Sequence, residues 1–278
     1  MNALVTIMHL TLHEAARRRI LVATLIGAGA FLILFGVGFH FVALNVEHDK
    51  GMDFLRRRMA LNFLTLAGLY ATHFLTLMTA VLLPVDTLSG EIASGVVQTV
   101  ASKPVNRSSI VLGKWLAFSL VAVAYFALVS SGVLVIARAI GHFTTPGLSL
   151  GLPLMALEAV VFVTLSIAGG ARLATVTNGI LVFGLYGIAF IGGWVEQVGA
   201  MLGNLAAENV GTVASLVMPT EALWHRAAYY MQPSVMRDLQ MTPFSPASLP
   251  SVAMVWYAAL YAALALLAGV QGFRKRAL

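Results

Sequence analysis

Cysteine is absent from this chain of 278 residues, and charged residues are scarce. Without thiols the protein cannot form disulfide bonds, thiolate zinc sites or iron–sulfur clusters, but this absence does not say in which compartment the chain resides. Asp, Glu, Lys and Arg make up 10% of the sequence, against about 25% in a typical soluble domain. Because 59% of the residues are hydrophobic and the mean hydropathy is +0.89, the composition predicts an all-α integral membrane protein.

Motifs for catalysis and nucleotide binding are also missing. A Walker A loop ends in Gly-Lys-Ser/Thr after an earlier glycine, whereas Gly-Lys at 113–114 is followed by Trp115 and has no such glycine before it. His9 and His13 have the spacing of a zinc helix, yet Leu10 stands where a metalloprotease needs its glutamate. We interpret the two histidines as part of a solvated helix face. The sequence therefore predicts a chain that is not an enzyme and has no catalytic, cofactor-binding or metal-binding residues.

Six hydrophobic stretches are long enough to cross a membrane. A spanning helix needs about 20 apolar residues. Five uncharged runs reach that length, and a sixth is interrupted by Glu158. The runs cover 20–44, 59–85, 115–137, 152–170, 173–195 and a last stretch that ends at Phe273. Residues 20–278 are therefore predicted to form a single six-helix transmembrane domain.

The distribution of basic residues predicts how the spans are oriented. With both chain ends in the cytoplasm, ten of the seventeen Lys and Arg lie inside with three acids, and seven bases and seven acids lie outside. This bias follows the positive-inside rule. Arg56, Arg57 and Arg58 go against it, because they fall outside, just before the second span. The net charge of +6 does not indicate a nucleic-acid partner, since the charges lie in short clusters beside apolar runs.

Residues 1–19 are predicted to form an amphipathic helix that lies in the membrane interface. A signal peptide is excluded because the arginines follow the first apolar residues and no small-residue cleavage site ends the next run. The polar face carries Thr6, His9, His13 and Arg17, and the apolar face carries Ala3, Ile7 and Leu10. Such a helix anchors to the bilayer by its apolar face.

The stretch 196–250 is predicted to be an extracytoplasmic insert. Its apolar pieces, such as 210–218, are too short to cross the bilayer, and five prolines divide it into short helices or hairpins. We expect these to lie on the outer surface. Trp224, Tyr229 and Tyr230 fit the membrane–water interface, where aromatic side chains collect.

Polar groups inside the spans are candidates for a substrate path. His73 lies near the middle of the second span, and Thr76 and Asn62 belong to the same polar stripe. Two interpretations stay open: His73 hydrogen-bonds to a neighbouring helix, or the stripe lines a substrate path. Glu158, in the fourth span, is expected to reach outward or to pair with Arg138 rather than to contact substrate.

A polar insert at 86–112, between the second and third spans, is far longer than a turn requires. Residues 92–101 are predicted to form a short helix that Pro104 stops. Asn106 or Ser108 can cap a second helix that continues into the third span. The expected product is a helix–turn–helix elbow on the cytoplasmic face, with a mixed apolar and charged surface that fits an interaction site.

Three elements of this insert carry a resemblance to a known family. They are, in chain order, Glu91-x-x-x-Gly95, Pro104-x-x-Arg107 and Leu112-Gly113-Lys114. Their order and spacing resemble the signature of type-2 ABC transporter permeases, the membrane subunits of exporter-like ABC systems. The helix at 1–19 is similar to the family's elbow helix, and 216–230 is similar to its Pro-x-acid-x-x-aromatic segment. The similarity covers nearly the whole chain, but only 84–114 is specific.

The resemblance implies a permease subunit that pairs with a second, identical or homologous, permease and docks on a separate cytoplasmic ATPase. ATP and Mg²⁺ would bind to that ATPase, and the insert would act as the coupling helix that transmits its motion into the bundle. Its framework would consist of Glu91, Gly95, Pro104, Arg107, Gly113 and Lys114. The family context leads us to expect export, a bacterial cytoplasmic (inner) membrane with cytoplasmic chain ends, and an extracytoplasmic accessory protein as a further candidate partner. No motif identifies the substrate.

A second class of function is compatible with the same composition: an ATPase-independent membrane protein, such as a secondary carrier or an assembly scaffold. A carrier usually contains inverted repeats and helices broken near the membrane midplane. No internal repeat is visible. Four glycines in the first span, Gly27, Gly29, Gly36 and Gly38, fit close helix contacts better than a break.

Overall fold

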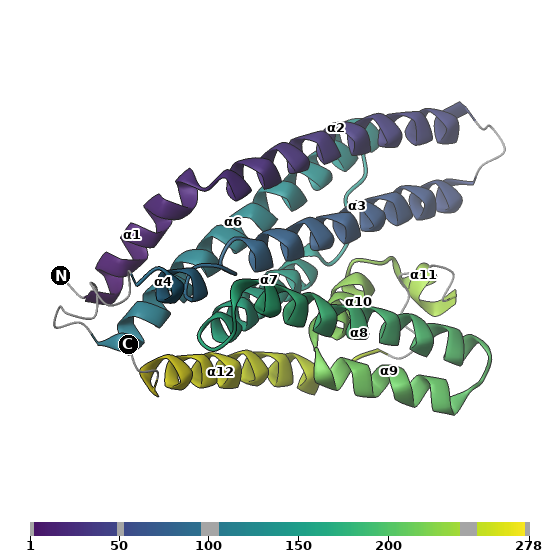
Figure 1. Cartoon of the computed structure of the whole chain (residues 1–278). Helices are drawn as coiled ribbons and strands as arrows, with labels where there is room; N and C mark the ends of the chain where they lie inside the picture. The colour runs from purple at the N-terminus through teal and green to yellow at the C-terminus, as the bar shows by residue number, and fades with distance from the viewer. Residues whose placement is uncertain (1–2, 49–52, 96–105, 240–248, 276–278) are drawn as a thin grey trace.

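The computed structural model describes residues 3–48, 53–95, 106–239 and 249–275, and this part of the chain is helical without any strand (Figure 1). Six of its helices are long and apolar enough to span a membrane. They are α2 (Arg19–His48), α3 (Phe54–Leu82), α6 (Arg107–Gly141), α7 (Leu148–Gly170), α8 (Thr175–Met201) and α12 (Val252–Lys275). The prediction of six spans, including the one interrupted by Glu158, is confirmed.

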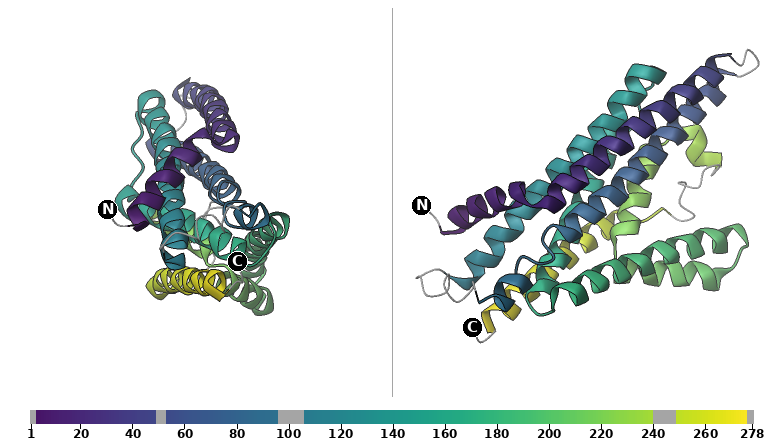
Figure 2. Two further views of the ribbon diagram at one scale, coloured as in Figure 1. Left: turned by 60° about the vertical axis from the view of Figure 1, so that its left-hand side comes forward. Right: turned by 45° about the horizontal axis from the view of Figure 1, so that its top comes forward.

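The six long helices form one elongated bundle, which Figure 2 shows from two further sides. Helix α6 is the longest, with 35 residues and a length of about 52 Å, and it contacts α2, α3, α7 and α12. Because the spans are even in number, the start of α1 and the end of α12 lie at the same end of the bundle (Figure 1). We call this the terminal end, and we call the opposite end, where α2 and α3 are joined, the loop end.

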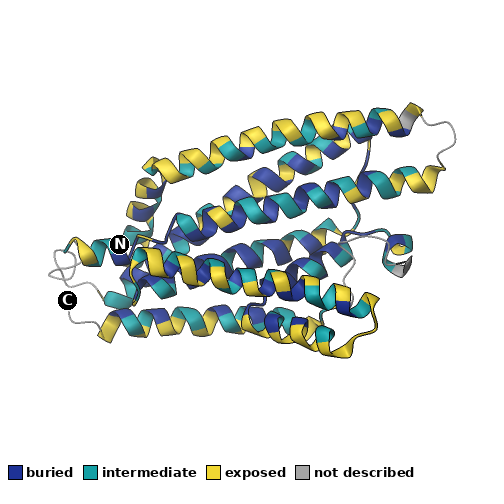
Figure 3. Ribbon diagram, turned by 45° about the vertical axis from the view of Figure 1, so that its right-hand side comes forward, coloured by how far each residue is buried: buried dark blue, intermediate teal, exposed yellow. Residues whose placement is uncertain are grey.

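Burial differs sharply between the spans. Within the most apolar window of α3 and of α7, 61% of residues are buried, against 6% for α2. Helix α2 is therefore largely surrounded by the medium and not by protein, as its exposed outer face in Figure 3 shows. It is one unbroken helix, and a β-carbon at Gly27, Gly29 or Gly38 would meet no atom of another part of the described chain within 4 Å. The interpretation that these three glycines serve close helix contacts is wrong for contacts inside this chain.

Helix α1 (Ala3–Arg17) precedes the first span, as predicted, and the helical conformation is interrupted at Arg18, between α1 and α2. Helix α1 packs along α6 with a face that includes Ile7, Thr11 and Ala15. Leu10, placed by sequence on the apolar face, is 66% exposed. Of the predicted apolar face, Ile7 packs against α6 and Leu10 stays exposed, and the position of this helix in the membrane interface stays a prediction.

The region after α8 forms short helices, as predicted, but only part of it lies on the surface. Helix α9 (Leu205–Val217) folds back along α8, and α10 (Thr220–Tyr230) packs against α7 and α8, with α11 (Ser234–Leu239) following it. Asn204 starts the return, because its side chain accepts hydrogen bonds from the amides of Ala206 and Ala207 at 3.0 and 3.3 Å. Trp224, expected at the membrane interface, is 1% exposed. The prediction of short helices is confirmed, whereas the prediction that they lie on the outer surface is wrong for α10, whose residues 220–224 are all buried.

Small residues allow α9 to pack closely against α8. A β-carbon on Gly192 of α8 would lie 2.2 Å from the β-carbon of Ala214 on α9. A β-carbon on Gly211 would lie 2.3 Å from that of Glu196. Glycine at these two positions lets the two backbones approach directly, as small residues do between membrane helices.

Candidate functional site

The segment that follows α3 is the first candidate site, because it contains residues 86–95 of the predicted coupling insert at 86–112. We call residues 83–95 the connector. Its helix, α4, covers Ser89–Ala93, and most of the helix predicted at 92–101 lies outside the described residues. The chain turns at Ser94, and Gly95 adopts a left-handed φ of +74°, which glycine accepts without strain. Residues 96–105, including Pro104, lie outside the described residues.

An ion pair fastens α4 to the third span. The carboxylate of Glu91 accepts a short charge-assisted hydrogen bond from the Lys114 ammonium on α6. The two side chains are 25% and 7% exposed, so the lysine charge is largely removed from solvent. The pair therefore needs both members, because either charge alone would stay poorly solvated.

Arg107 and Gly113, two further predicted framework residues, contact other elements. Arg107 begins α6, and its guanidinium donates to the carbonyl of Arg274 near the end of α12 at 3.2 Å. A β-carbon on Gly113 would lie 2.9 Å from the Ile7 side chain and 3.0 Å from the Leu4 carbonyl oxygen. Glycine at this position thus allows α1 to pack directly on α6. Residue 107 begins the helix that continues into the third span, as predicted, and the Asn106 side chain makes no cap hydrogen bond.

Two polar contacts that the sequence did not predict complete the anchoring of the connector. Arg18 donates to the Leu83 carbonyl at 2.9 Å, which joins the connector to the α1–α2 break. The hydroxyl of Thr175, the first residue of α8, donates to the Asp86 carboxylate at 2.7 Å and lies 2.8 Å from the Ser89 hydroxyl. The connector is therefore tied to α8 and α6 and to the N-terminal segment. Arg18 could not be told apart from its neighbours in the Arg17–Arg19 run, and no motif marks Thr175.

A cavity lies directly beside the Glu91–Lys114 pair. It has a volume of about 140 Å³ and is lined by residues of α1, α4 and α6. Ile7, Leu10 and Ile110 make part of its wall apolar, and Glu14 adds a carboxylate. Its surface is therefore mixed in character, as expected for a contact with another protein.

The second candidate site is a polar cluster in the middle of the bundle. His73 Nδ1 lies 2.7 Å from a Glu158 carboxylate oxygen, and His73 Nε2 lies 3.1 Å from the Tyr186 hydroxyl. The three side chains come from α3, α7 and α8 and are all buried. The prediction that Glu158 reaches outward or pairs with Arg138 is wrong. Arg138 instead donates to the Thr144 hydroxyl at 2.8 Å.

Aromatic rings enclose this cluster. Tyr70 lies parallel to His73, with 6.0 Å between ring centroids, and Trp224 of α10 lies 6.1 Å from the same imidazole. Trp224 reaches this position because α10 packs against α7 and α8. Such a shell lowers the local dielectric, so the hydrogen bonds within the cluster matter more than they would in water.

Two ionisable residues of α10 lie near the cluster, outside the six spanning helices. His225 Nε2 lies 3.6 Å from a carboxylate oxygen of Glu221. Burial raises the pKa of Glu221 to about 7 and lowers the pKa of His225 to about 4, because a low-dielectric surrounding disfavours charge on either group. Both residues line a cavity of about 30 Å³, which has room for about one water molecule.

The three residues predicted to line a substrate path all lie inside the bundle on α3. Asn62 donates to the Met231 carbonyl at 2.9 Å, and His73 and Thr76 are each 3% exposed. None of the five cavities found among the described residues is lined by Asn62, His73 or Thr76. His73 therefore makes the hydrogen bonds to neighbouring helices that one of the two interpretations expected. That these residues line a substrate path stays a prediction.

Comparison with protein-family models and with curated protein sequences finds no match to this chain. The functional argument therefore rests on the residues and contacts described above.

Proposed function

We propose that this chain is the membrane-spanning permease subunit of an ABC transporter. In this proposal two permease subunits assemble, and a separate cytoplasmic ATPase binds the connector and the insert that follows it. The observation that carries the proposal is the Glu91–Lys114 ion pair. It joins two of the residues that resemble the family signature and fixes α4 onto α6.

The contacts of the connector support a mechanical role. A segment that transmits force must move together with the helices behind it. The connector continues directly from α3, is paired to α6 through Lys114 and is hydrogen-bonded to α8 through Thr175. A displacement applied at α4 would therefore be passed to three spans together. The cavity between α1, α4 and α6 offers a surface on which a side chain of the ATPase can seat.

The division of labour follows from the same residues. ATP and Mg²⁺ are assigned to the ATPase, since the described residues and the sequence around Lys114 offer no phosphate-binding loop. This chain would supply the route for the substrate across the membrane and the segment that couples ATP hydrolysis to its movement. The terminal end of the bundle is the cytoplasmic end in this proposal, because the connector that would bind the ATPase lies there. The proposed direction of transport is export.

The test is purification of the full-length chain from its native membrane, followed by measurement of ATP hydrolysis in the purified complex. We expect Glu91→Ala and Lys114→Ala each to lower co-purifying ATPase activity by about tenfold or more, because each leaves a partly buried charge without its partner. The exchanged pair, Glu91→Lys with Lys114→Glu, should restore part of it. Glu208→Ala on α9, near the loop end, is the matched control and should retain wild-type activity.

The alternative of an ATPase-independent carrier draws support from one observation, the buried His73–Glu158 pair, since ionisable groups inside a bundle often mark ion-coupled sites. Against it, each of the six spanning helices is continuous. Substrate accumulation in vesicles that contain only this chain, without ATP, would establish the carrier and overturn the permease proposal.

A further inference from the structure

The small cavity between α3, α8 and α10 is lined by a carboxylate that is only partly satisfied. Glu221 is 3% exposed, and its Oε2 atom has no hydrogen-bond partner among the described residues. Its other oxygen, Oε1, lies 3.6 Å from His225 Nε2. Because burial lowers the pKa of His225 to about 4, the imidazole is uncharged at neutral pH and does not compensate an ionised Glu221. A buried carboxylate in this position favours a ligand that brings a positive charge.

The rest of the cavity lining fits the head of a small cation. No Lys or Arg is among the lining residues, whereas three of them, Tyr70, Trp194 and Trp224, are aromatic, and aromatic rings attract ammonium groups. The volume of about 30 Å³ holds a group the size of a water molecule, such as a primary ammonium, but not a trimethylammonium. Gly193 keeps this space open, because a β-carbon there would lie 3.1 Å from Glu221 Cγ. Both charge and size therefore point to a primary ammonium.

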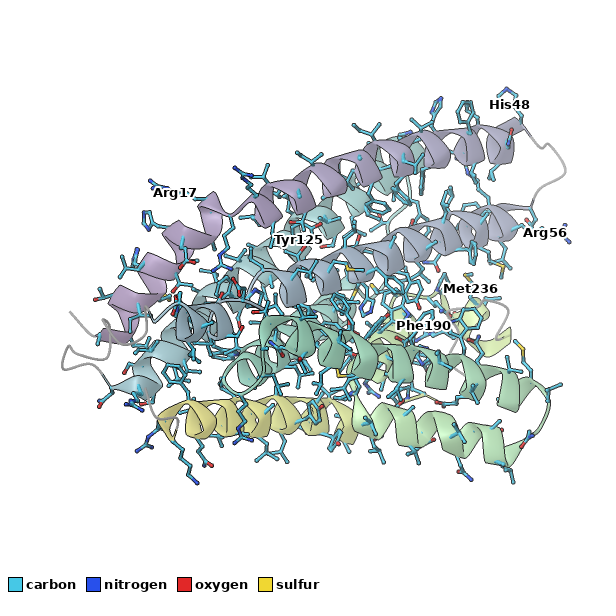
Figure 4. The ribbon with its side chains drawn as sticks, viewed as in Figure 1. Arg17, His48, Arg56, Tyr125, Phe190 and Met236 are labelled. Atoms are coloured by element: carbon cyan, nitrogen blue, oxygen red, sulfur yellow. The ribbon has the colours of Figure 1, made fainter. Side chains whose placement is uncertain are left out.

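A larger apolar groove adjoins this cavity at Trp194, which lines both. Its volume is about 570 Å³, within the range of roughly 300–1,000 Å³ that small-molecule sites occupy. The groove follows α8 from Phe190, which is labelled in Figure 4, to Leu202, and Ala207 of α9 lines it from the other side. Apart from Asn204 its lining is apolar. Because Trp194 is 48% exposed, the groove can be reached from the medium around the spanning helices.

We propose that the small cavity and the apolar groove together bind an amphiphilic primary amine. The ammonium group enters the cavity and donates charge-assisted hydrogen bonds to the Glu221 carboxylate, while the hydrocarbon part passes Trp194 and lies in the groove. The site accounts for a carboxylate that is kept inside the bundle without a cationic side chain beside it. The inference does not depend on the proposed transport function, because it concerns binding at equilibrium.

The test is a scintillation proximity assay with tritiated octylamine on the full-length protein in phosphatidylcholine nanodiscs, with empty nanodiscs as background. Octylamine should bind saturably to the wild-type protein. Unlabelled 1-octanol, which has the same chain without the charge, should compete about tenfold less well or worse, since hydrogen bonds to charged groups are among the stronger ones. Octyltrimethylammonium keeps the charge but has too large a head, and it should also compete about tenfold less well. Equal competition by either compound, or no saturable binding of octylamine, overturns the proposal.

Substitution of the carboxylate locates the site. Glu221→Gln removes the charge with little change of shape and should weaken octylamine binding by about tenfold or more. Glu196→Gln on α8 is the matched control, because Glu196 lines a different cavity, and it should stay within about twofold of wild type. Binding that is unchanged in Glu221→Gln, or reduced equally in Glu196→Gln, counts against the site.

A second pair of variants keeps the charge and changes only the space beside it. Gly193→Ala places a methyl group next to the Glu221 side chain and should weaken octylamine binding several-fold. Gly187→Ala on the same helix is its control, because a β-carbon there would meet no atom within 4 Å, and it should bind as wild type does. Should Glu221→Gln not elute as a folded protein, this pair carries the test, and wild-type binding by Gly193→Ala then overturns the proposal.

Discussion

At the scale of single residues, buried polar groups in this bundle are held in pairs across helices. His73 and Glu158 are 85 positions apart in sequence, yet their side chains lie 2.7 Å apart in a shell of aromatic rings. The energetic consequence is asymmetric. Removing one member leaves the other without a partner in a low-dielectric surrounding, while removing both leaves only a space to be filled.

We therefore predict that Glu158→Ala destabilises the protein by about 3 kcal/mol, and that Glu158→Gln destabilises it less because the amide can still hydrogen-bond to His73. The double variant His73→Ala, Glu158→Ala should lose less stability than the sum of the single variants. Unfolding of the detergent-solubilised variants measures all three values as a double-mutant cycle. Simple additivity would show that the two side chains do not interact.

At the scale of elements, the terminal end is organised by the contact between α1 and α6. At Gly113, a residue of the family-like signature, the two helices approach closely, because a β-carbon there would meet a backbone oxygen that cannot rotate away. The signature glycine therefore has a packing explanation in this structure. The predicted helix at 1–19 exists as an element, whereas its contact surface depends on α6.

Substitution of Gly113 tests this explanation. Gly113→Val should displace α1 from α6 and cost about 1–3 kcal/mol of overpacking. Hydrogen exchange should then be faster at the amides of α1 than in the wild-type protein. Gly29→Val on α2 is the matched control, because a β-carbon there would meet no atom within 4 Å, and it should leave α1 protected. Equal protection of α1 in wild type and Gly113→Val would contradict the assigned role.

At the scale of the whole molecule, α9 and α10 add two shorter helices to the six-helix bundle: α9 packs along α8, and α10 packs against α7 and α8. Helix α9 keeps apolar side chains on its outer face, with Val210 and Val213 more than half exposed. We therefore expect this face of α9 to lie against lipid.

The absence of cysteine makes this arrangement testable by single-cysteine labelling with a membrane-impermeant maleimide. Leu202→Cys lies in the α8–α9 turn and is expected to react in intact cells. Ala93→Cys, on α4 at the terminal end, should react only after permeabilisation. Val213→Cys should stay unlabelled under both conditions, since a thiol in lipid does not ionise. Labelling of Val213→Cys as readily as Leu202→Cys would show that α9 is exposed to water on the outer surface.

The number and approximate position of the six spans followed from sequence alone, because the length of an apolar run is a local property and the bilayer sets the length required. The family resemblance also singled out Glu91 and Gly95 of the connector. Only the tertiary structure decided which partners they have: Lys114 for Glu91, Thr175 for Asp86 and His73 for Glu158. The same holds for the path of 205–230. These outcomes depend on which helices pack together and where small residues let them approach, and such contacts join positions too distant in the chain for local pattern or spacing to reveal.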